Sequence, residues 1–456
     1  MISLGPNKRS AARSSTSTWA TPGLALIAVL VLVSAIEVTA ETQSFRDHSA
    51  QFSRYKPAEE YTPAVSRCKV EQVIVLERGG ASRPDAHLAA SIQASLAKVV
   101  GKSDYKNSQL NFLANYTYNL GSDGALLPMG QIKELWIQFR KRYCDTEGMW
   151  KQDCLDYSIA SADSPALVDS AKNWRAGLLQ GANAPADAAL VTINSTLAAP
   201  SCPNLVSSVP TAQQQWRDVW TPAVIQRLQS GGENYGLNST DVINFAYMCA
   251  LESAAIGSTS PFCGLFIDSE WSHIEYDGDL GKYFNHAYGA PLARTQAVRY
   301  TTELLSRLTW FFPLIRRQAQ PRITSKLPVY VDVTSDDQLL SFMTLLGFFD
   351  DATLSTTLPC PMRSFVTSKM IPFAGRIVVE RMTCTGHGFW KEFLYKISDS
   401  SPAYVRVLVN DKSVNLSQLC DEDDRVEGGT MCTLTSFSEH VKARLQEATK
   451  DSAKCR

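Results

Sequence analysis

Charged side chains follow two of the strands that the sequence predicts, at the point where each strand ends. The β-branched run Val70–Leu76 leads into Glu77-Arg-Gly-Gly80, and the run Val329–Val333 is soon followed by Asp336. A guanidinium and a carboxylate at two strand ends offer an anion ligand and a group that can exchange protons. Arg78 and Asp336 therefore indicate a pocket for a small ligand. The alternative is that each makes a structural ion pair or hydrogen bond near the strand ends.

Other combinations of reactive residues are less specific. Glu77 and Asp336 would suit a carboxylate pair for another kind of hydrolysis, but the sequence does not fix the distance between them. The Cys-x-x-Cys and Cys/His spacings of zinc sites are absent, so we expect no metal and no cofactor. The histidines are interpreted as surface or core residues: His48, His87, His273, His286, His387 and His440.

Alternating strands and helices must position these residues. A helix is expected after the N-cap candidate Asp85, and another from Pro128 to Tyr143. Residues 216–310 have a mainly helical pattern, and strands are expected again at Val329–Val333, Arg376–Glu380 and Tyr404–Leu408. Strand and helix alternation at both ends of a helical middle predicts an α/β sheet domain with a helical insertion.

The composition is that of a large globular chain. It has 456 residues, of which 45% are hydrophobic and 20% charged, and 44 Lys and Arg against 45 Asp and Glu give a net charge of −1. No long-range positive field exists to attract nucleic acid or an anionic membrane, so we expect neither as a partner. Any anion site must be local.

The N-terminus predicts export. Basic residues precede the apolar run from Gly23 to Ile36, and a small-residue site ends at Ala40, so residues 1–40 are interpreted as a signal peptide. An uncleaved signal anchor is the alternative, although the run is short for a membrane span. Residues 41–65 are expected to form an extended N-terminal arm. Four N-glycosylation sequons fit a secreted or cell-surface eukaryotic protein: Asn115, Asn194, Asn238 and Asn415.

The segment Glu77-Arg-Gly-Gly-Ala-Ser-Arg-Pro84 resembles the strand-end motif Arg-His-Gly-x-Arg-x-Pro of the histidine acid phosphatases. The resemblance to the fungal phytase-like branch of that family continues down almost the whole exported chain, through Asn115–Gly121, Ser260–Cys263, Glu270-Trp271, Leu280-Gly-Lys-Tyr283, Glu303–Thr309, Pro372–Arg376 and Val405–Asp411. It implies a histidine-phosphatase-like body over 66–456. An α/β core of about 66–200 and 320–456 would enclose a helical insertion of about 205–315.

The catalytic positions depart from the family pattern. In the family the motif histidine takes the phosphoryl group, arginines and a second histidine hold its oxygens, and the aspartate of a His-Asp pair protonates the leaving oxygen. The resemblance aligns these positions with residues that lack most of that chemistry: Arg78, Gly79, Ser82, Ile159, Ser335 and Asp336. Arg83 is a candidate for a shifted arginine. No histidine or cysteine stands where it would obviously replace the nucleophile.

The positions that bind substrate in the family also carry different residues in this sequence. Fungal phytases use basic residues after the strand-end motif and a Lys-Lys pair after Glu-Trp. The matching positions here are interpreted as Asp85–Ala90 and Ser272-His273. The resemblance therefore implies a pocket that is no longer basic, which argues against binding of phytate.

The resemblance also implies four disulfide bonds: Cys68 with Cys384, Cys202 with Cys455, Cys249 with Cys263, and Cys420 with Cys432. Cys144 and Cys154 are close enough in sequence to pair across a short loop. Cys360 is left over, either as a buried free thiol or as a bond to another chain.

These observations predict an exported, catalytically inactive member of the family that is not an enzyme. It would bind or scaffold other proteins, in a fungal cell-surface complex or as a secreted effector directed at a host. One alternative is a weak or altered acid phosphatase with displaced catalytic residues. The other is a small-molecule receptor that uses a closed apolar pocket near Ile159.

Overall fold

The computed structural model describes residues 44–126, 130–146, 157–179, 191–205, 209–309, 327–385 and 402–456. Residues 44–456 belong to one compact unit. The expected signal peptide, residues 1–40, lies outside the described residues.

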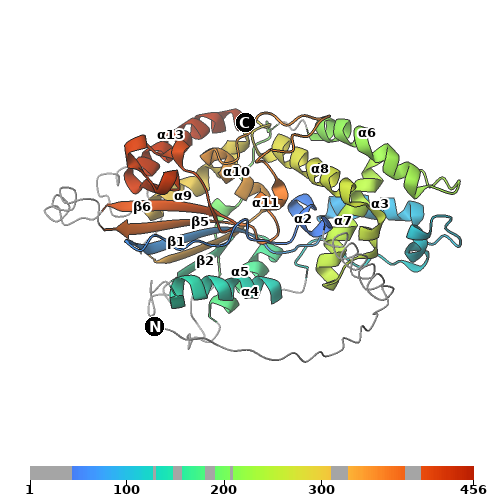
Figure 1. Ribbon diagram of the computed structural model, residues 1–456, viewed down its shortest axis with the longest axis horizontal. Helices are drawn as coiled ribbons and strands as arrows, with labels where there is room; N and C mark the ends of the chain where they lie inside the picture. Colours follow the sequence, from blue (N-terminus) through green and yellow to red (C-terminus); the bar gives the residue numbers. More distant parts are fainter. Residues whose placement is uncertain are drawn as a thin grey trace, which may run out of the picture. The chain divides into compact units, whose positions relative to one another are not determined.

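The described residues are built around a mixed sheet, whose strands number nine. Figure 1 shows its longer strands side by side. Strand β1 (Cys68–Arg78) pairs in parallel with β4 (Val329–Thr334), and β4 pairs in parallel with β2 (Tyr157–Ser161). On its other side β1 pairs antiparallel with β5 (Arg376–Cys384), which pairs antiparallel with β6 (Ala403–Val409). Short strands complete the sheet: β3 (Thr192–Ile193), β7 (Lys412–Ser413), β8 (Arg425–Val426) and β9 (Met431–Thr433). The predicted α/β class and the four longest predicted strands are confirmed.

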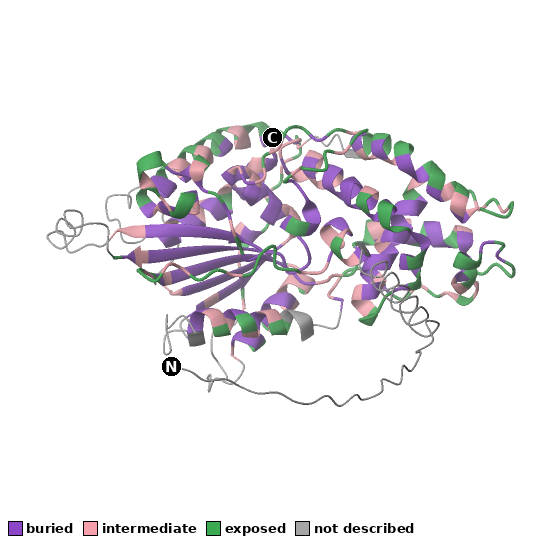
Figure 2. Ribbon diagram, in the orientation of Figure 1, coloured by how far each residue is buried: buried purple, intermediate pink, exposed green. Residues whose placement is uncertain are grey.

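Both faces of the sheet are buried, as the purple strands of Figure 2 show. Side chains of β1 alternate, so Ile74 and Leu76 join the larger hydrophobic core while Val73 and Val75 join the smaller one. The smaller core is covered by α4 (Gly130–Arg140) and α5 (Pro165–Leu178) through Trp136 and Trp174. The larger core includes α10 (Asp336–Leu346) and α13 (Leu434–Ser452).

The first predicted helices form where the sequence places them. The side chain of Asp85 accepts a hydrogen bond from the Leu88 amide at 2.8 Å and so caps α3 (Ala86–Val99). Helix α4 is described from Gly130 to Arg140 and continues into a π-helical turn, Lys141–Thr146, whereas the predicted start at Pro128 lies outside the described residues.

Between β3 and β4 the described residues are mainly helical. Helices α6 (Val209–Leu228), α7 (Ser239–Ile256), α8 (Asp268–His286) and α9 (Val298–Leu308) occupy this part of the sequence. Figure 1 shows α6, α7 and α8 grouped with α3 beside the sheet. Shorter helices are α11 (Thr367–Met370) and the 3-10 turns Ser108–Asn115, Ser195–Leu197, Pro261–Leu265, Ala293–Ala297, Ser417–Leu419, Glu422–Asp424, Glu427–Gly429 and Ala453–Cys455.

The described part of the expected N-terminal arm differs from a simple extended segment. It begins with two short helical turns, α2 (Ser44–Asp47) and η1 (Ala50–Phe52), and only afterwards lacks regular structure. These turns pack against α8, where a Cβ at Gly278 would lie 2.2 Å from that of Ala50. The glycine is therefore needed for the close approach, which tertiary packing rather than local pattern determines.

Disulfides join distant parts of this unit. The structure forms all four bonds that the family resemblance implied: Cys68–Cys384, Cys202–Cys455, Cys249–Cys263 and Cys420–Cys432. Cys154 lies outside the described residues, so its pairing with Cys144 stays a prediction. Cys360 is free and exposed, so the expectation of a buried thiol is wrong, because the loop that carries it lies at the surface.

Three of the four sequon asparagines are exposed: Asn115, Asn238 and Asn415. Asn194 is half-buried, and its amide nitrogen donates to both carboxylate oxygens of Glu303 at 3.2 and 3.0 Å. Within the described ranges, no helix is long and apolar enough to span a membrane.

Candidate functional site

Arg78 and Asp336 meet at the carboxyl ends of two parallel strands. Arg78 is the last residue of β1 and pairs in register with Thr334 of β4, two residues before Asp336. The guanidinium Nη2 of Arg78 lies 3.5 Å from Oδ2 of Asp336. Adjacent parallel strands end at the same edge of a sheet, which is why two distant sequence segments converge here.

Helix α8 supplies a second cation that the sequence interpretation missed. Nζ of Lys282 lies 3.0 Å from Oδ2 of Asp336 and 2.6 Å from Oδ1 of Asp337. His286 follows one helical turn later, with Nε2 3.3 Å from Oδ1 of Asp337. The signal was present in the sequence, since residues four apart on a helix share a face and Lys282 belongs to a segment that resembles the family. We call Arg78, Lys282, His286, Asp336 and Asp337 the strand-end cluster.

Burial and charge determine the ionisation of this cluster. Burial alone would raise the pKa of Asp336, but Lys282 and Arg78 outweigh burial and hold that pKa well below its usual value. Burial lowers the pKa of His286, and Lys282 lowers it further, so the imidazole is neutral near neutral pH. The cluster then contains two cations and two carboxylates, so their charges balance.

The N-terminal segment completes the surroundings of Arg78. Nη1 of Arg78 donates to the backbone carbonyl of Gln51 and, at 2.6 Å, to that of Ile371. The guanidinium carbon lies 4.6 Å from the centroid of the Phe373 ring. These contacts fix one edge of the guanidinium, and its other edge faces Asp336.

No side chain occupies the position that aligns with the family nucleophile. A Cβ added to Gly79 would lie 2.5 Å from Cδ2 of Leu167 and 3.3 Å from Oγ of Ser170, both on α5. The space beside Gly79 is therefore filled from α5. Ser335, at the position of the second family histidine, is the N-cap of α10, where its side chain accepts a hydrogen bond from the Gln338 amide at 3.2 Å.

The remaining predicted pocket residues lie away from the cluster. Ile159 is 1% exposed in β2 and packs in the smaller core, so it belongs to the interior and not to an apolar receptor pocket. Ser82 pairs through its backbone with Ala125. The exposed Arg83 donates to the carbonyl of Leu120 at 3.0 Å, so it does not replace the missing arginine.

Glu77 does not pair with Asp336. Neighbouring residues of a strand point to opposite faces, and Glu77 lies 3.9 Å from Nη1 of Arg376 on the face covered by α4 and α5. Burial raises its pKa well above the usual value. The proposed carboxylate pair for hydrolysis is therefore not formed.

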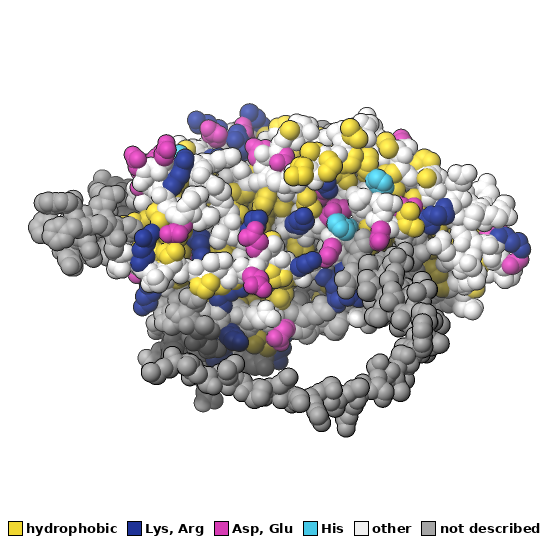
Figure 3. Space-filling model, viewed as in Figure 1, with side chains coloured by type: hydrophobic (Ala, Val, Ile, Leu, Met, Phe, Trp, Pro, Cys, Tyr) yellow, Lys and Arg dark blue, Asp and Glu magenta, His cyan; other side chains and the backbone are white. Residues whose placement is uncertain are grey.

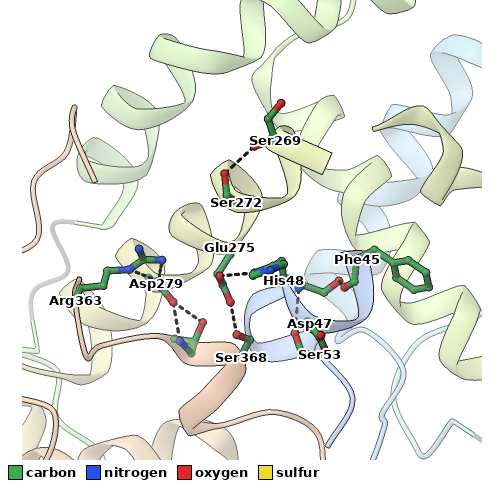
Figure 4. A network of polar contacts seen from close by, with 12 residues as sticks. Phe45, Asp47, His48, Ser53, Ser269, Ser272, Glu275, Asp279, Arg363 and Ser368 are labelled. Atoms are coloured by element: carbon green, nitrogen blue, oxygen red, sulfur yellow. Dashed lines mark hydrogen bonds and ion pairs between the residues drawn. The ribbon is translucent and has the colours of Figure 1, made fainter. Parts of the chain in front are cut away.

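The two residues interpreted as replacing the Lys-Lys pair are also elsewhere. The His273 ring stacks on Trp220 with 5.6 Å between centroids, and Ser272 donates to the Ser269 carbonyl within α8 (Figure 4). The cation that α8 supplies to the strand ends is instead Lys282, ten residues after Ser272.

A cavity of about 370 Å³ opens beside the loop after β1. Its walls are mainly apolar, with Phe373 shared between the cavity and the packing of Arg78, and its charged lining residues are Arg54 and Glu134. Gly80 and Ala81 form part of its wall. Among the described residues, no group of three or more His, Cys, Asp or Glu side chains could hold a metal ion.

The described residues thus form an α/β sheet with a charged cluster at its strand ends, which Lys282 connects to the helical part of the chain. The sequence pattern of the histidine phosphatase superfamily (branch 2) matches residues 69–410, and the chain belongs to this superfamily.

Known relatives agree with this assignment. Phytase A of Aspergillus terreus is 28% identical over 403 residues, covering 79% of this chain and 82% of the relative. An acid phosphatase of Schizosaccharomyces pombe is 26% identical over 422 residues, covering 86% of each chain. These matches confirm the resemblance to the phytase-like acid phosphatases.

Solved structures share the fold. The phytase from D. castellii superimposes with a TM-score of 0.71 at 18% identity, covering 89% of this chain and 85% of the other. A Bifidobacterium longum multiple inositol polyphosphate phosphatase, solved with inositol hexasulfate, gives 0.63 at 10% identity, covering 87% and 97%.

These comparisons correct one expectation from the sequence. The chain was expected not to be an enzyme, but its relatives over most of their length are named phytase and acid phosphatase, which points to enzymatic activity. That expectation is therefore wrong. The four disulfides indicate an oxidising, extracellular environment, as expected for an exported protein.

Proposed function

We propose that this chain is an exported phosphomonoesterase with an altered active site, which hydrolyses small phosphate esters at acid pH without a histidine nucleophile. The observation that supports this most directly is the convergence of Arg78 and Lys282 on Asp336 at the strand ends, in a member of a phosphatase superfamily. This was the alternative of a weak or altered acid phosphatase in the sequence analysis.

Phosphate binding would use the two cations. Arg78 and Lys282 are both held by buried contacts, so their positive ends are positioned before a substrate arrives. Since Asp336 and Asp337 already balance their charge near neutral pH, a phosphate dianion is attracted only weakly. Protonation of His286 at acid pH adds a positive charge beside Asp337. The cluster then has a net positive charge and attracts an anion more strongly.

Water would be the attacking group, because Gly79 offers no side-chain nucleophile. In this step the oxygen of water bonds to phosphorus as the ester P–O bond breaks. Asp336 accepts the proton of the water, and protonated His286 gives a proton to the leaving oxygen, so the products are phosphate and an alcohol. Asp336 is a weak base because its pKa is held low, which predicts slow turnover.

The substrate's alcohol group would occupy the cavity of about 370 Å³, which Phe373 connects to Arg78. The volume and mainly apolar wall of this cavity suit a small alcohol group carrying one phosphate. Arg54 and Glu134 contribute opposite charges, so the cavity offers no surplus of positive charge to a hexaphosphate. We therefore propose simple phosphomonoesters, rather than phytate, as the substrate class.

The experiment compares an aryl phosphate with phytate, using the purified exported chain, residues 41–456, across acid pH. We expect kcat/KM for the aryl ester to exceed that for phytate by more than tenfold. Hydrolysis of a chiral phosphate ester should invert the configuration at phosphorus, since water attacks once. A faster rate on phytate would refute the proposed substrate class, and retention of configuration would refute direct attack by water.

A further inference from the structure

A second and larger cavity, of about 980 Å³, lies away from the strand-end cluster. It is bounded by the N-terminal segment around residues 46–58, the turn after α10, the residues before and within α11, and the turn between β6 and β7. Helix α10 runs from Asp336 in the cluster to Leu346 beside this cavity, so the two sites are roughly 16 Å apart along its axis. We call it the basic cavity.

Cations predominate in its lining. On the face shown in Figure 3, Lys and Arg side chains gather near the place where Figure 1 draws α2 and α11, with acidic side chains among them. The cavity is lined by six cations and two carboxylates: Arg46, Arg54, Lys56, Arg363, Lys369 and Lys412, with Asp47 and Asp350.

Three of the six cations are already neutralised. Lys56 lies 3.1 Å from Asp47, Arg363 lies 2.7 Å from the buried Asp279, and Lys412 lies 2.5 Å from Glu59. Of the two carboxylates in the lining, Asp47 is used in one of these pairs. Only Asp350 is left to balance the charge of the three remaining cations.

The other three cations are Arg46, Arg54 and Lys369. Among the described residues, none of the three has a carboxylate within 4.0 Å, the limit for an ion pair. Burial lowers the pKa of Arg54, and the neighbouring Arg46 lowers it further, so these two guanidinium groups lie close enough to repel each other. Like charges held together in a concave surface are relieved by a bound anion.

His48 also lines the cavity, but its ring pairs with the buried Glu275 and so adds no net charge. Its Nδ1 lies 2.7 Å from Oε2 of Glu275, whose other oxygen accepts a hydrogen bond from Ser368 (Figure 4). The hydrogen bond with Glu275 raises the pKa of His48, against burial and the nearby Lys369. Below neutral pH the ring is therefore protonated, and Figure 4 shows the network that anchors α2 to α8 and α11 through it.

We propose that the basic cavity binds an anion that carries two or more phosphate groups. Two arginine side chains from the N-terminal segment and Lys369 from α11 line the cavity. Guanidinium groups bind phosphate oxygens in a bidentate manner, and the volume is that of a small-molecule site. The basic cavity shares Arg54 with the smaller cavity, but none of its lining residues belongs to the strand-end cluster. The proposal does not depend on the proposed function.

The test measures binding of tripolyphosphate, inorganic phosphate and sulfate to the exported chain by calorimetry at low ionic strength. We expect tripolyphosphate to bind more tightly than the two simple anions. Arg46→Glu together with Lys369→Glu should weaken its binding roughly 100-fold or more, because two charged contacts become repulsive. The exposed Lys102→Glu, outside the cavity lining, is the matched control and should leave Kd unchanged.

Two further measurements distinguish the possible ligands. Asn415 lines the cavity, so binding is measured before and after enzymatic deglycosylation. Flotation with vesicles that contain phosphatidylinositol bisphosphate distinguishes a lipid headgroup from a soluble ligand. Three results would overturn the proposal. They are an equal loss of binding in the Lys102→Glu control, binding that appears only after deglycosylation, and no binding of either tripolyphosphate or the vesicles. None of these outcomes bears on phosphate release at the strand-end cluster, so the two proposals fail separately.

Discussion

The ammonium of Lys282 lies 3.0 Å from the carboxylate of Asp336, and this contact joins the helical part of the chain to the end of the sheet. Asp336 begins α10, so its carboxylate is also near the positive end of a helix dipole. Lys282 and Arg78 together keep Asp336 ionised. Lys282 thus sets the protonation state of Asp336, and in the proposed mechanism it also helps to bind the substrate phosphate.

Replacing Lys282 by methionine should weaken substrate binding while keeping most of the packing of the side-chain stem. We expect KM for an aryl phosphate to rise by roughly 10- to 100-fold, because a charged hydrogen bond to phosphate contributes about 1.5–3 kcal/mol. Steady-state kinetics measure this. Lys98→Met is the control, since Lys98 forms a comparable ion pair with Asp241 at 2.7 Å on another helix. A KM that is equal in both variants would contradict the assigned role of Lys282.

The pH profile should depend on His286. Burial and Lys282 lower its pKa below the usual 6.5, so its protonated form accumulates only as the pH falls below that value. We therefore expect kcat/KM to rise toward acid pH in the unaltered protein, and to lose most of that rise in His286→Gln. A profile that rises toward neutral pH, or one that the substitution does not change, would show that another group controls the step.

Restoring a histidine at position 79 should need a second change. Gly79→His alone forces the new side chain against Leu167 and should cost about 1–3 kcal/mol of stability. Gly79→His with Leu167→Ala should recover stability and allow a phosphoenzyme to form, detected as acid-labile phosphoryl label on the protein. Leu167→Ala alone controls for the cavity that it leaves. Equal denaturation midpoints for the single and double variants would contradict the assigned clash.

Glycan occupancy should differ among the sequons. The amide of Asn194 is held by Glu303, whereas Asn115, Asn238 and Asn415 are exposed. In protein secreted from a eukaryotic cell, we expect glycopeptide mass spectrometry to find a glycan at the exposed sites and little at Asn194. Glu303→Ala frees that amide and should raise its occupancy. High occupancy at Asn194 in the unaltered protein would mean that modification precedes this contact.

The sequence predicted the elements of the fold better than the contacts of the site. Apolar runs rich in β-branched residues located β1, β4, β5 and β6, and the family motifs located Arg78 and Asp336 near the ends of β1 and β4. The cysteine pairs also followed from the resemblance. These features depend on local patterns or on residues that the family shares.

Contacts between residues far apart in the sequence were harder to predict from the sequence. Ile159 was expected in the pocket but lies in the core, because one residue of error along a strand moves a side chain to the other face. Lys282 was overlooked because its role depends on how α8 crosses the strand ends. The expectation of inactivity came from the altered motif positions, chiefly Gly79 and Ser335, and the relatives named as phosphatases overturn it.

The most direct test of the central claim is phosphate release from an aryl phosphate by the folded, exported chain at acid pH, measured beside Arg78→Ala and Lys282→Met. We predict slow but saturable turnover that copurifies with the protein and falls at least tenfold in each variant. Absence of turnover from folded protein, or turnover that neither substitution reduces, would contradict the assignment of the strand-end cluster as an active site.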